Sequence, residues 1–511
     1  MAGTRIRMAL YGVLSAAAYA SLLPLWEGFD EPFHYAYVQT LSRQARVPVR
    51  KQSGVSGEVR ASLPLAPASH VVARNIPGLT TFAEWFRLPA EERARRREAL
   101  CAIPPALGDR IPDDGTNYEA QQAPLAYLLL APLDRLWSGA PLPGRVWRLR
   151  VAAGAFAAAA ASLGTLALAA QLGLPPAWAA WMAFLLLSSQ MFYAAAAHVS
   201  NEWLAIAVAP WFFTAAAAYA ARPDKRRAAA LGLLLAAGLL AKAYYLALAP
   251  LALALALWKR RGAWAVAVPV ALLAGPWYWR NWTRYGTLTG ALENIVDHGL
   301  ADIAAALLRM PWGATLAASA RRSLWTANNS FDTFSAATLN VMLALALAAA
   351  LLYARAVWRK PAAPAERVLL AGIALFAGLL AYSTAALYLV FGETGLAGAP
   401  WYTPVIYPAV LGLLACGLAR AGKPGRWIGA AMAVLWAYVF VATWWVKLIP
   451  LYGGYAGRAR PGALAAWYAA GPSLLGHTAM LPEAAVLALA ALSTVACVAL
   501  AAAIARAALR A

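Results

Sequence analysis

The chain has 511 residues, of which 62% are hydrophobic and only 13% are charged, and its mean hydropathy is +0.58. A soluble protein of this length needs many more polar side chains to cover its core, so we expect lipid to be the solvent for most of the chain. The formal net charge of +21 does not indicate nucleic-acid binding, because the basic residues are spread over both predicted membrane faces. Attraction to anionic lipid headgroups explains this charge more simply.

Apolar runs recur from end to end of the chain, and most have the roughly 17–25 residues that cross about 30 Å of hydrocarbon. The runs are continuous and not alternating, and lipid offers an exposed backbone no hydrogen-bond partner, so they must form helices. The sequence therefore predicts an all-α polytopic membrane protein with about 12 transmembrane helices. The predicted spans are 8–26, 149–172, 177–197, 203–221, 228–242, 244–258, 263–280, 336–354, 367–391, 401–419, 427–446 and 483–505.

The orientation follows from the short connections, since cytoplasmic loops are enriched in Lys and Arg. With twelve spans, all the basic short connections fall on the same side as both termini, whereas the connections 198–202 and 392–400 carry no Lys or Arg. We therefore expect cytoplasmic N- and C-termini, and the Ala- and Arg-rich composition favours a bacterial inner (cytoplasmic) membrane. The basic side contains Arg5, Arg7, Arg222, Lys225, Arg226, Arg227, Lys259, Arg260, Arg261, Arg355, Arg359, Lys360, Arg367, Arg420, Lys423 and Arg426.

Three longer segments then face outward within a single membrane domain that covers residues 1–511. They are 27–148, 281–335 and 447–482. The first is too long to be a simple connector. Its stretch 89–103 is rich in Glu and Arg and predicts a short helix on the membrane surface. Its apolar run 124–137 is too short to span a bilayer and predicts a second, interfacial helix.

Two adjacent carboxylates, Asp30 and Glu31, stand where the chain leaves its first span, followed by Pro32 and His34. Proline fixes the turn and restricts the preceding residue, so the two acids are held on a defined bend. Partly desolvated carboxylates that lie side by side repel, which raises the proton affinity of one of them. A general base needs such an environment. The alternative interpretation is a solvated loop whose acids only mark the membrane border.

Further polar groups emerge on the same predicted face, at the ends of other spans. Aromatic residues at such positions usually belong to the interfacial belt, and Lys or Arg usually extends toward the headgroups. Their shared face nevertheless favours one common site. The groups are Tyr118, Glu119 and Gln122 before the interfacial helix, Asn201 and Glu202 after the third span, Lys242 at the fifth, and Arg280 and Asn281 at the seventh.

The acidic pair in its context, DEPFH at 30–34, resembles the GT-C superfamily of membrane glycosyltransferases. The similarity is to bacterial relatives of the protein O-mannosyltransferases and lipid A aminoarabinose transferases. It extends to YEAQQAPLAY at 118–127, which is similar to a YEAxxPPLYYLL pattern, and to SNE at 200–202, where the usual form is SND. It includes RN at 280–281 followed by YG. In arrangement the resemblance covers most of the chain, but in residues it covers only these short stretches.

The sequence departs from the family before the tenth span. Many relatives carry Gly-Arg-Tyr there, followed by spaced prolines, whereas this chain has PWYTP at 400–404. Tyr402 and the prolines remain, but Trp401 replaces the arginine. If that arginine contacts the donor phosphate in relatives, this protein has another ligand, another donor or no activity.

The resemblance implies inverting transfer of a sugar from a polyprenyl-phosphate carrier to an acceptor hydroxyl on the outer face of the inner membrane. The partners would be the lipid-linked sugar, the bilayer and a glycan, lipid or protein acceptor. Asp30 would be the general base, with Glu31 or Glu119 sharing the proton or orienting the acceptor. Lys242 and Arg280 would stabilise the leaving phosphate, with His34 or Arg43 as secondary candidates. The expected donor- or acceptor-binding residues are His34, Tyr118, Glu119, Gln122, Asn201, Glu202 and Tyr402.

Other interpretations stay open at this point. A transporter or flippase usually has polar residues at mid-membrane, whereas here those positions are almost purely Ala, Leu and Val. An O-antigen-type ligase or polymerase would share the outer site but use a lipid-diphosphate donor, and a non-catalytic GT-C relative would fit the missing arginine. No cofactor is indicated. A divalent ion at Asp30, Glu31 and Glu119 is compatible with the sequence, although no ligand spacing demands one.

Overall fold

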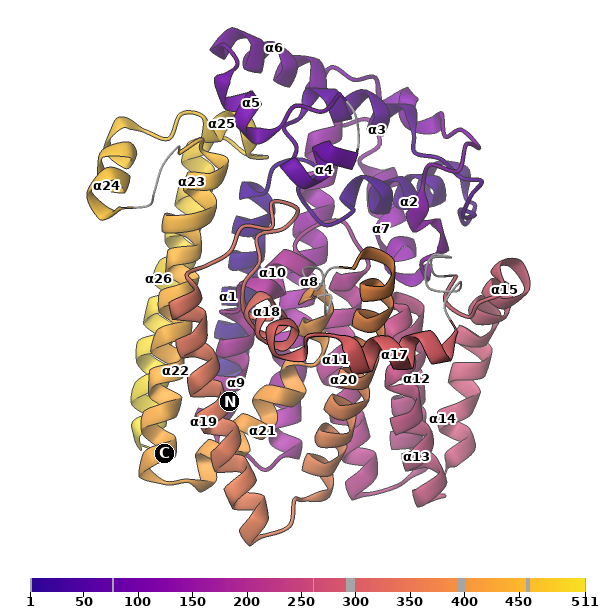
Figure 1. Cartoon of the computed structure of the whole chain (residues 1–511), viewed down its shortest axis with the longest axis vertical. Coiled ribbons are helices and arrows are strands. Elements are labelled where there is room, and N and C mark those ends of the chain that lie inside the picture. The colour runs from indigo at the N-terminus through magenta and orange to yellow at the C-terminus, as the bar shows by residue number, and fades with distance from the viewer. Residues whose placement is uncertain are drawn as a thin grey trace.

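The computed structural model describes residues 2–75, 78–260, 262–290, 299–392, 400–455 and 460–510. Within these ranges the chain forms helices and no β-strand, apart from one isolated bridge between Ala68 and Thr81. A bundle of long helices stands beneath a layer of short helices, which comes from the first predicted loop (Figure 1). The predicted all-α fold is confirmed.

Each predicted span coincides with a helix or with a series of consecutive helices. The unbroken ones are α1 (Ala2–Leu22), α8 (Leu142–Gln171), α11 (Glu202–Ala221), α12 (Lys225–Ala241), α19 (Ala336–Arg359), α20 (Pro364–Phe391) and α26 (Glu483–Arg510). The predicted span 401–419 begins in η6 (Pro400–Val405) and continues as α21 (Tyr407–Arg420). The series are α9 (Pro176–Leu187) with α10 (Gln190–Ala196), η4 (Ala243–Ala247) with α13 (Ala249–Lys259), α14 (Ala263–Pro269) through η5 (Val270–Ala274) to α15 (Gly275–Tyr285), and α22 (Lys423–Ala442) through η7 (Thr443–Leu448) to α23 (Ile449–Tyr452).

Length and hydropathy alone qualify fewer helices as spans. Among the described residues six helices are long and apolar enough to cross a membrane, or up to seven if the pair α9 and α10, bent by 57°, counts as one span. The count of about twelve therefore stays a prediction. Two of the shorter helices that it includes, Ala243–Lys259 and Tyr407–Arg420, are apolar and stand in the same bundle (Figure 1).

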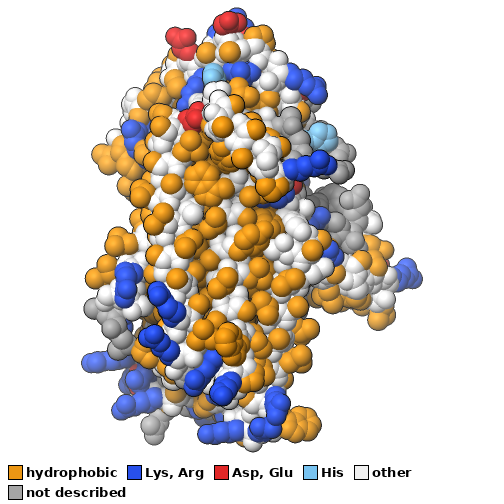
Figure 2. All heavy atoms as spheres, turned by 90° about the vertical axis from the view of Figure 1, so that its left-hand side faces the viewer, with side chains coloured by type: hydrophobic (Ala, Val, Ile, Leu, Met, Phe, Trp, Pro, Cys, Tyr) orange, Lys and Arg blue, Asp and Glu red, His pale blue; other side chains and the backbone are white. Residues whose placement is uncertain are grey.

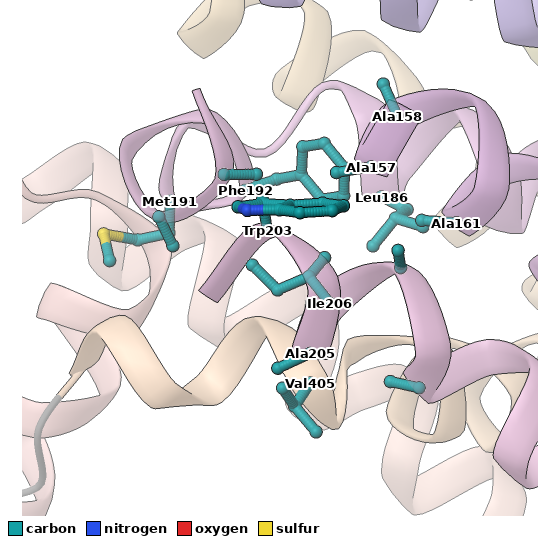
Figure 3. Packing of buried hydrophobic residues seen from close by; sticks show 14 of the residues in the cluster. Ala157, Ala158, Ala161, Leu186, Met191, Phe192, Trp203, Ala205, Ile206 and Val405 are labelled. Carbon is teal, nitrogen blue, oxygen red and sulfur yellow. The ribbon is translucent and has the colours of Figure 1, made fainter. Parts of the chain in front are cut away.

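Small residues let the central helices approach closely. A Cβ atom added to Gly154 on α8 would lie 3.1 Å from Cβ of Ala16 on α1, and one added to Gly12 would lie 2.9 Å from Cβ of Ala158. Figure 3 shows how alanines of α8 leave room for Trp203 and Ile206 of α11. Van der Waals packing of this kind holds helices together in lipid, where burial of apolar surface supplies no driving force.

The segment 27–148 forms the upper layer. It contains α2 (Glu31–Gln44), α3 (Gly57–Ser62), η1 (Leu63–Leu65), α4 (His70–Asn75), α5 (Phe82–Arg87), α6 (Ala90–Cys101), η2 (Pro105–Asp109), η3 (Tyr118–Gln121) and α7 (Leu125–Leu136). The two helices predicted from 89–103 and 124–137 correspond to α6 and α7.

An ion network that the sequence did not predict fixes this layer to the bundle. Arg145 at the start of α8 is fully buried and pairs with Glu58 of α3 and Asp134 of α7. Tyr35 donates a hydrogen bond of 2.9 Å to Asp134, which also accepts one of 2.5 Å from Ser42. Removing one member of such a network leaves a buried charge without its partner, which is strongly destabilising.

The other predicted outer segments contain α17 (Leu300–Arg309), α18 (Trp312–Leu324), α24 (Pro461–Ala470) and α25 (Leu475–Thr478). Residues 76–77, 291–298 and 456–459 of these three loops lie outside the described residues. Lys and Arg side chains gather at the lower end of the molecule, away from the helical layer, and a broad hydrophobic band lies between (Figure 2). This distribution has the form that the positive-inside rule requires, although the orientation itself stays a prediction.

Candidate functional site

Asp30 lies where the bundle meets the upper layer. It is the N-cap of α2 and has left-handed backbone angles, φ 53° and ψ 20°, a conformation that Asp adopts more readily than most residues. Two residues earlier, Gly28 passes so close to His198 that an added Cβ would lie 2.6 Å from the histidine Cβ. The Gly28 carbonyl accepts a 2.9 Å hydrogen bond from Asn329. The bend that carries Asp30 is therefore held from two sides.

The Asp30 side chain is open to solvent although the residues on both sides of it are largely buried. The Tyr118 hydroxyl donates a short hydrogen bond to its Oδ1, and the Tyr118 ring packs on Phe33 at a centroid distance of 4.3 Å. Dense protein around the carboxylate raises the pKa of Asp30, while the Tyr118 hydrogen bond and the charge of Lys242 lower it in part. Asp30 is thus an accessible carboxylate with increased basicity, which suits proton abstraction.

A chain of buried polar contacts lies beside Asp30. The Lys242 ammonium is 2.5 Å from the Glu202 carboxylate and donates to Oδ1 of Asn201 at 2.7 Å. The Asn201 amide in turn donates to Oε1 of Gln122 at 3.1 Å. Lys242 reaches this position because α12 ends there in an extended residue before η4 begins. Three segments far apart in sequence are joined by this one lysine.

Glu119 and His34 form the other wall of the site. Burial, followed by the negative charge of Asp30, raises the pKa of Glu119 to about 7, and its Oε2 has no hydrogen-bond partner among the described residues. Nδ1 of His34 lies 3.9 Å from that oxygen and 2.7 Å from the Tyr127 hydroxyl. Burial lowers the pKa of His34 to about 3, so the histidine is neutral and the contact with Glu119 is not an ion pair.

Aromatic rings close the site on the side of the η6 segment (Pro400–Val405). Trp401, which stands where many GT-C relatives carry arginine, lies 5.4 Å from the ring of Phe29 and 5.9 Å from that of Tyr402. The Tyr402 ring lies 5.8 Å from the Lys242 ammonium. An aromatic surface therefore lies next to Phe29, the residue that precedes Asp30.

The structure brings most of the predicted site residues together. They are Asp30, His34, Tyr118, Glu119, Gln122, Asn201, Glu202, Lys242 and Tyr402. His198, Phe29 and Tyr244 also line this region. All three belong to the sequence stretches that drew attention to this site, although none was assigned a role in it.

Glu31 points away from Asp30 and into the bundle. Its carboxylate is fully buried and accepts hydrogen bonds from Arg150 of α8 at 2.7 and 2.5 Å and from the Val199 amide at 2.9 Å. Burial by itself raises the pKa of Glu31, but Arg150 reverses the effect and holds it below its usual value. Because this buried carboxylate is paired with Arg150, it is not placed to share a proton with Asp30. We therefore propose that Glu31 positions the bend that carries Asp30.

Two of the predicted phosphate ligands, Arg43 and Arg280, make other contacts than those of this group. Arg43 belongs to the buried network, since it lies 3.9 Å from Asp134 and donates to the Ser138 carbonyl at 3.3 Å. Arg280 donates to the Pro48 carbonyl at 3.2 Å and packs over the Trp277 ring. Among the described residues no group of three or more His, Cys, Asp or Glu side chains is placed to hold a metal ion. In particular, Glu31 does not converge with Asp30 and Glu119.

No protein family profile matches the chain, and no curated protein matches it. Two solved structures resemble it. ArnT from Cupriavidus metallidurans, bound to undecaprenyl phosphate, has 13% sequence identity and a TM-score of 0.49, with 99% of this chain and 76% of ArnT covered. The apo oligosaccharyltransferase from Archaeoglobus fulgidus has 13% identity and a TM-score of 0.36, with 95% and 56% covered.

Proposed function

We propose that this protein transfers a glycosyl unit from a polyprenyl-phosphate carrier to an acceptor hydroxyl, with Asp30 as general base. The observation that carries the proposal is the accessibility of one carboxylate, Asp30, within a buried polar group where the bundle meets the upper layer. A donor with a polyisoprenoid tail stays in the bilayer, so its sugar phosphate sits at the interface. Asp30 lies in the short connection between α1 and α2, where the bundle meets the upper layer, and so would meet the donor at that depth.

In the proposed reaction the Asp30 carboxylate takes the proton of the acceptor hydroxyl. The acceptor oxygen forms a bond to the anomeric carbon, and the bond between that carbon and the phosphate oxygen breaks. The polyprenyl phosphate leaves with the electron pair. Attack from the side opposite the phosphate inverts the anomeric centre. A general base in this position contributes about 10²–10⁴-fold in rate.

The leaving phosphate gains negative charge and needs fixed cations. Lys242 is the cation in the group around Asp30, but Glu202 already neutralises much of its charge. Arg280 has no acidic partner among the described residues. Its positive charge partly offsets the effect of burial on the pKa of Tyr37, and the Tyr37 hydroxyl donates to the Gln122 carbonyl. We therefore assign donor-phosphate binding to both cations and give Arg43 a structural role.

Two further assignments belong to this proposal. The carrier is of the undecaprenyl-phosphate class, and the acceptor is a glycan, a lipid or a protein on the outer face of a bacterial inner membrane. Both termini would then be cytoplasmic. Trp401 in place of a cation favours one competing function, a GT-C relative that binds lipid-linked sugar without transferring it.

Mass spectrometry of glycolipids and envelope glycans tests the proposal. Cells that lack the gene are supplied with the wild-type protein, with D30N, or with D113N as a matched control, because Asp113 lies in the same layer and is exposed. We expect D30N to accumulate a polyprenyl-phosphate sugar and lose one glycan product, while D113N behaves as wild type. A wild-type profile for D30N at normal protein levels would overturn the role of Asp30. Identical profiles with and without the gene would support the binding-only relative.

A further inference from the structure

A cavity of about 250 Å³ lies away from Asp30 and shares no residue with the site described above. It is enclosed by α5 and α6 of the upper layer, the start of α8 and the segment at α25. Most of its wall is apolar and comes from side chains such as Leu25, Leu65, Leu100 and Met480. Leu25 follows α1 directly, so the cavity lies at the level where the bundle meets the upper layer.

The charged groups that line the cavity are all basic. Arg97 of α6 and Arg148 of α8 face it together with His477, and no Asp or Glu is among the lining residues. Arg97 donates to the Ala479 carbonyl at 3.3 Å and Arg148 lies over the Trp137 ring. Neither arginine has an acidic partner in the described part of the chain. The guanidinium groups of Arg97 and Arg148 therefore place positive charge, without a neighbouring carboxylate, beside the apolar wall of the cavity.

Buried polar atoms in the wall also lack partners. The Trp85 indole is 1% exposed, and its Nε1 has no acceptor among the described residues. Nδ1 of His477 is likewise buried and without a partner. Burial and the charges of Arg93 and Arg97 lower the pKa of His477. Unpaired buried donors are rare, and each favours a ligand that supplies an acceptor oxygen.

We infer that this cavity binds the headgroup of an anionic lipid. The phosphate oxygens would accept hydrogen bonds from Arg97, Arg148 and the Trp85 indole, while the lipid chain follows the leucine side of the wall. The face in Figure 2 carries a broad hydrophobic band below an upper end where Lys, Arg and His side chains lie with a few Asp and Glu side chains, and a lipid headgroup would sit at that border. The inference is independent of sugar transfer, because it requires no residue of the Asp30 site.

The chain contains its own reporter for this cavity. Cys101 lines it and is exposed, whereas Cys416 and Cys497 are buried. Alkylation of the purified full-length protein by N-ethylmaleimide should therefore report mainly on Cys101. The probes are micelles containing dioleoyl phosphatidylglycerol, the same micelles with dioleoyl phosphatidylcholine, and inorganic phosphate alone. We expect only phosphatidylglycerol to slow the alkylation.

Substitutions identify the groups responsible. R97Q, R148Q and W85F each remove donors from the wall, and we expect R97Q and R148Q to raise the lipid concentration for half-protection about tenfold or more, the usual effect of losing a charge-assisted hydrogen bond. W85F keeps the ring and should have a smaller effect. R95Q is the matched control, since Arg95 lies on the same helix, is exposed and faces Glu92.

The outcomes separate the sources of the anion. Protection by phosphatidylglycerol that is weakened in R97Q or R148Q and unchanged in R95Q supports the inference. Equal protection by phosphatidylcholine, or by inorganic phosphate without lipid, overturns it, because either result removes the need for an amphipathic anion. Unchanged protection in both R97Q and R148Q also overturns it. A melting curve for each variant shows that the compared proteins are folded.

Discussion

Replacing Glu31 should lower the stability of the fold without directly affecting the transfer reaction. Its carboxylate accepts two hydrogen bonds from Arg150 and one from the Val199 amide, and both side chains of the pair are fully buried. Arg150 also donates to the Leu23 and Pro24 carbonyls at 2.5 and 2.8 Å, so it connects α8 to the bend before Asp30. Removing one partner of a buried pair typically costs about 3–5 kcal/mol.

We therefore expect E31Q to lower the free energy of unfolding by about 3–5 kcal/mol, because it leaves the Arg150 charge buried and unpaired. The double variant E31Q/R150M should recover much of this loss, since it removes both charges. The lowered pKa of Glu31 means that the stabilisation is present above the ordinary carboxyl pKa. It disappears only as the pH falls through the lowered value.

Thermal unfolding in detergent, followed by size-exclusion chromatography, measures these differences. A melting temperature of E31Q that equals the wild-type value would refute the assignment. Additive effects of E31Q and R150M would also refute it, because residues in contact should show a coupling free energy of about 3 kcal/mol. A strong loss of transfer activity in E31Q without loss of stability would indicate that Glu31 takes part in the transfer reaction.

Three further predictions concern other contacts. Y118F removes the hydrogen bond that lowers the pKa of Asp30, so the acid limb of the pH profile of kcat/KM should move to higher pH. E202Q leaves Lys242 without its carboxylate and should lower the melting temperature, with donor KM as a second readout. Burial raises the pKa of Glu27 to about 7, so its stability contribution is present below the ordinary carboxyl pKa and lost as pH rises through 7. The free energy of unfolding, measured from pH 5 to 8, should therefore fall for the wild type relative to E27Q as the pH rises.

The helices were predictable because apolar runs are bounded by charged or turn-forming residues. The predicted spans 149–172 and 483–505 coincide with α8 and α26 to within several residues. The break between α9 and α10 was not predicted, since the run 177–197 is apolar throughout and its hydropathy carries no signal of a 57° bend. In α10 and α11 nearly every side chain is buried, so no amphipathic pattern fixes which face meets which neighbour.

The predicted topology identified most residues of the site, but it did not predict which of these residues pair with one another. Asp30, Glu202 and Lys242 were expected on one membrane face, and the structure places them in one group. Glu31 was expected to act with Asp30 because the two residues are neighbours in the sequence. On a helix, however, consecutive side chains point in different directions, and Arg150 lies on the side that Glu31 faces. A buried arginine at the edge of an apolar span was the available signal for this pair.

The most direct test is the rate at which the purified protein transfers sugar from a polyprenyl-phosphate donor when Asp30 is replaced by asparagine. The substitution keeps the size of the side chain and an acceptor oxygen for Tyr118, so fold and donor binding should persist. If Asp30 removes the acceptor proton, D30N should lose at least about 10²-fold in turnover at saturating donor. Turnover within a few-fold of the wild-type value would contradict the account.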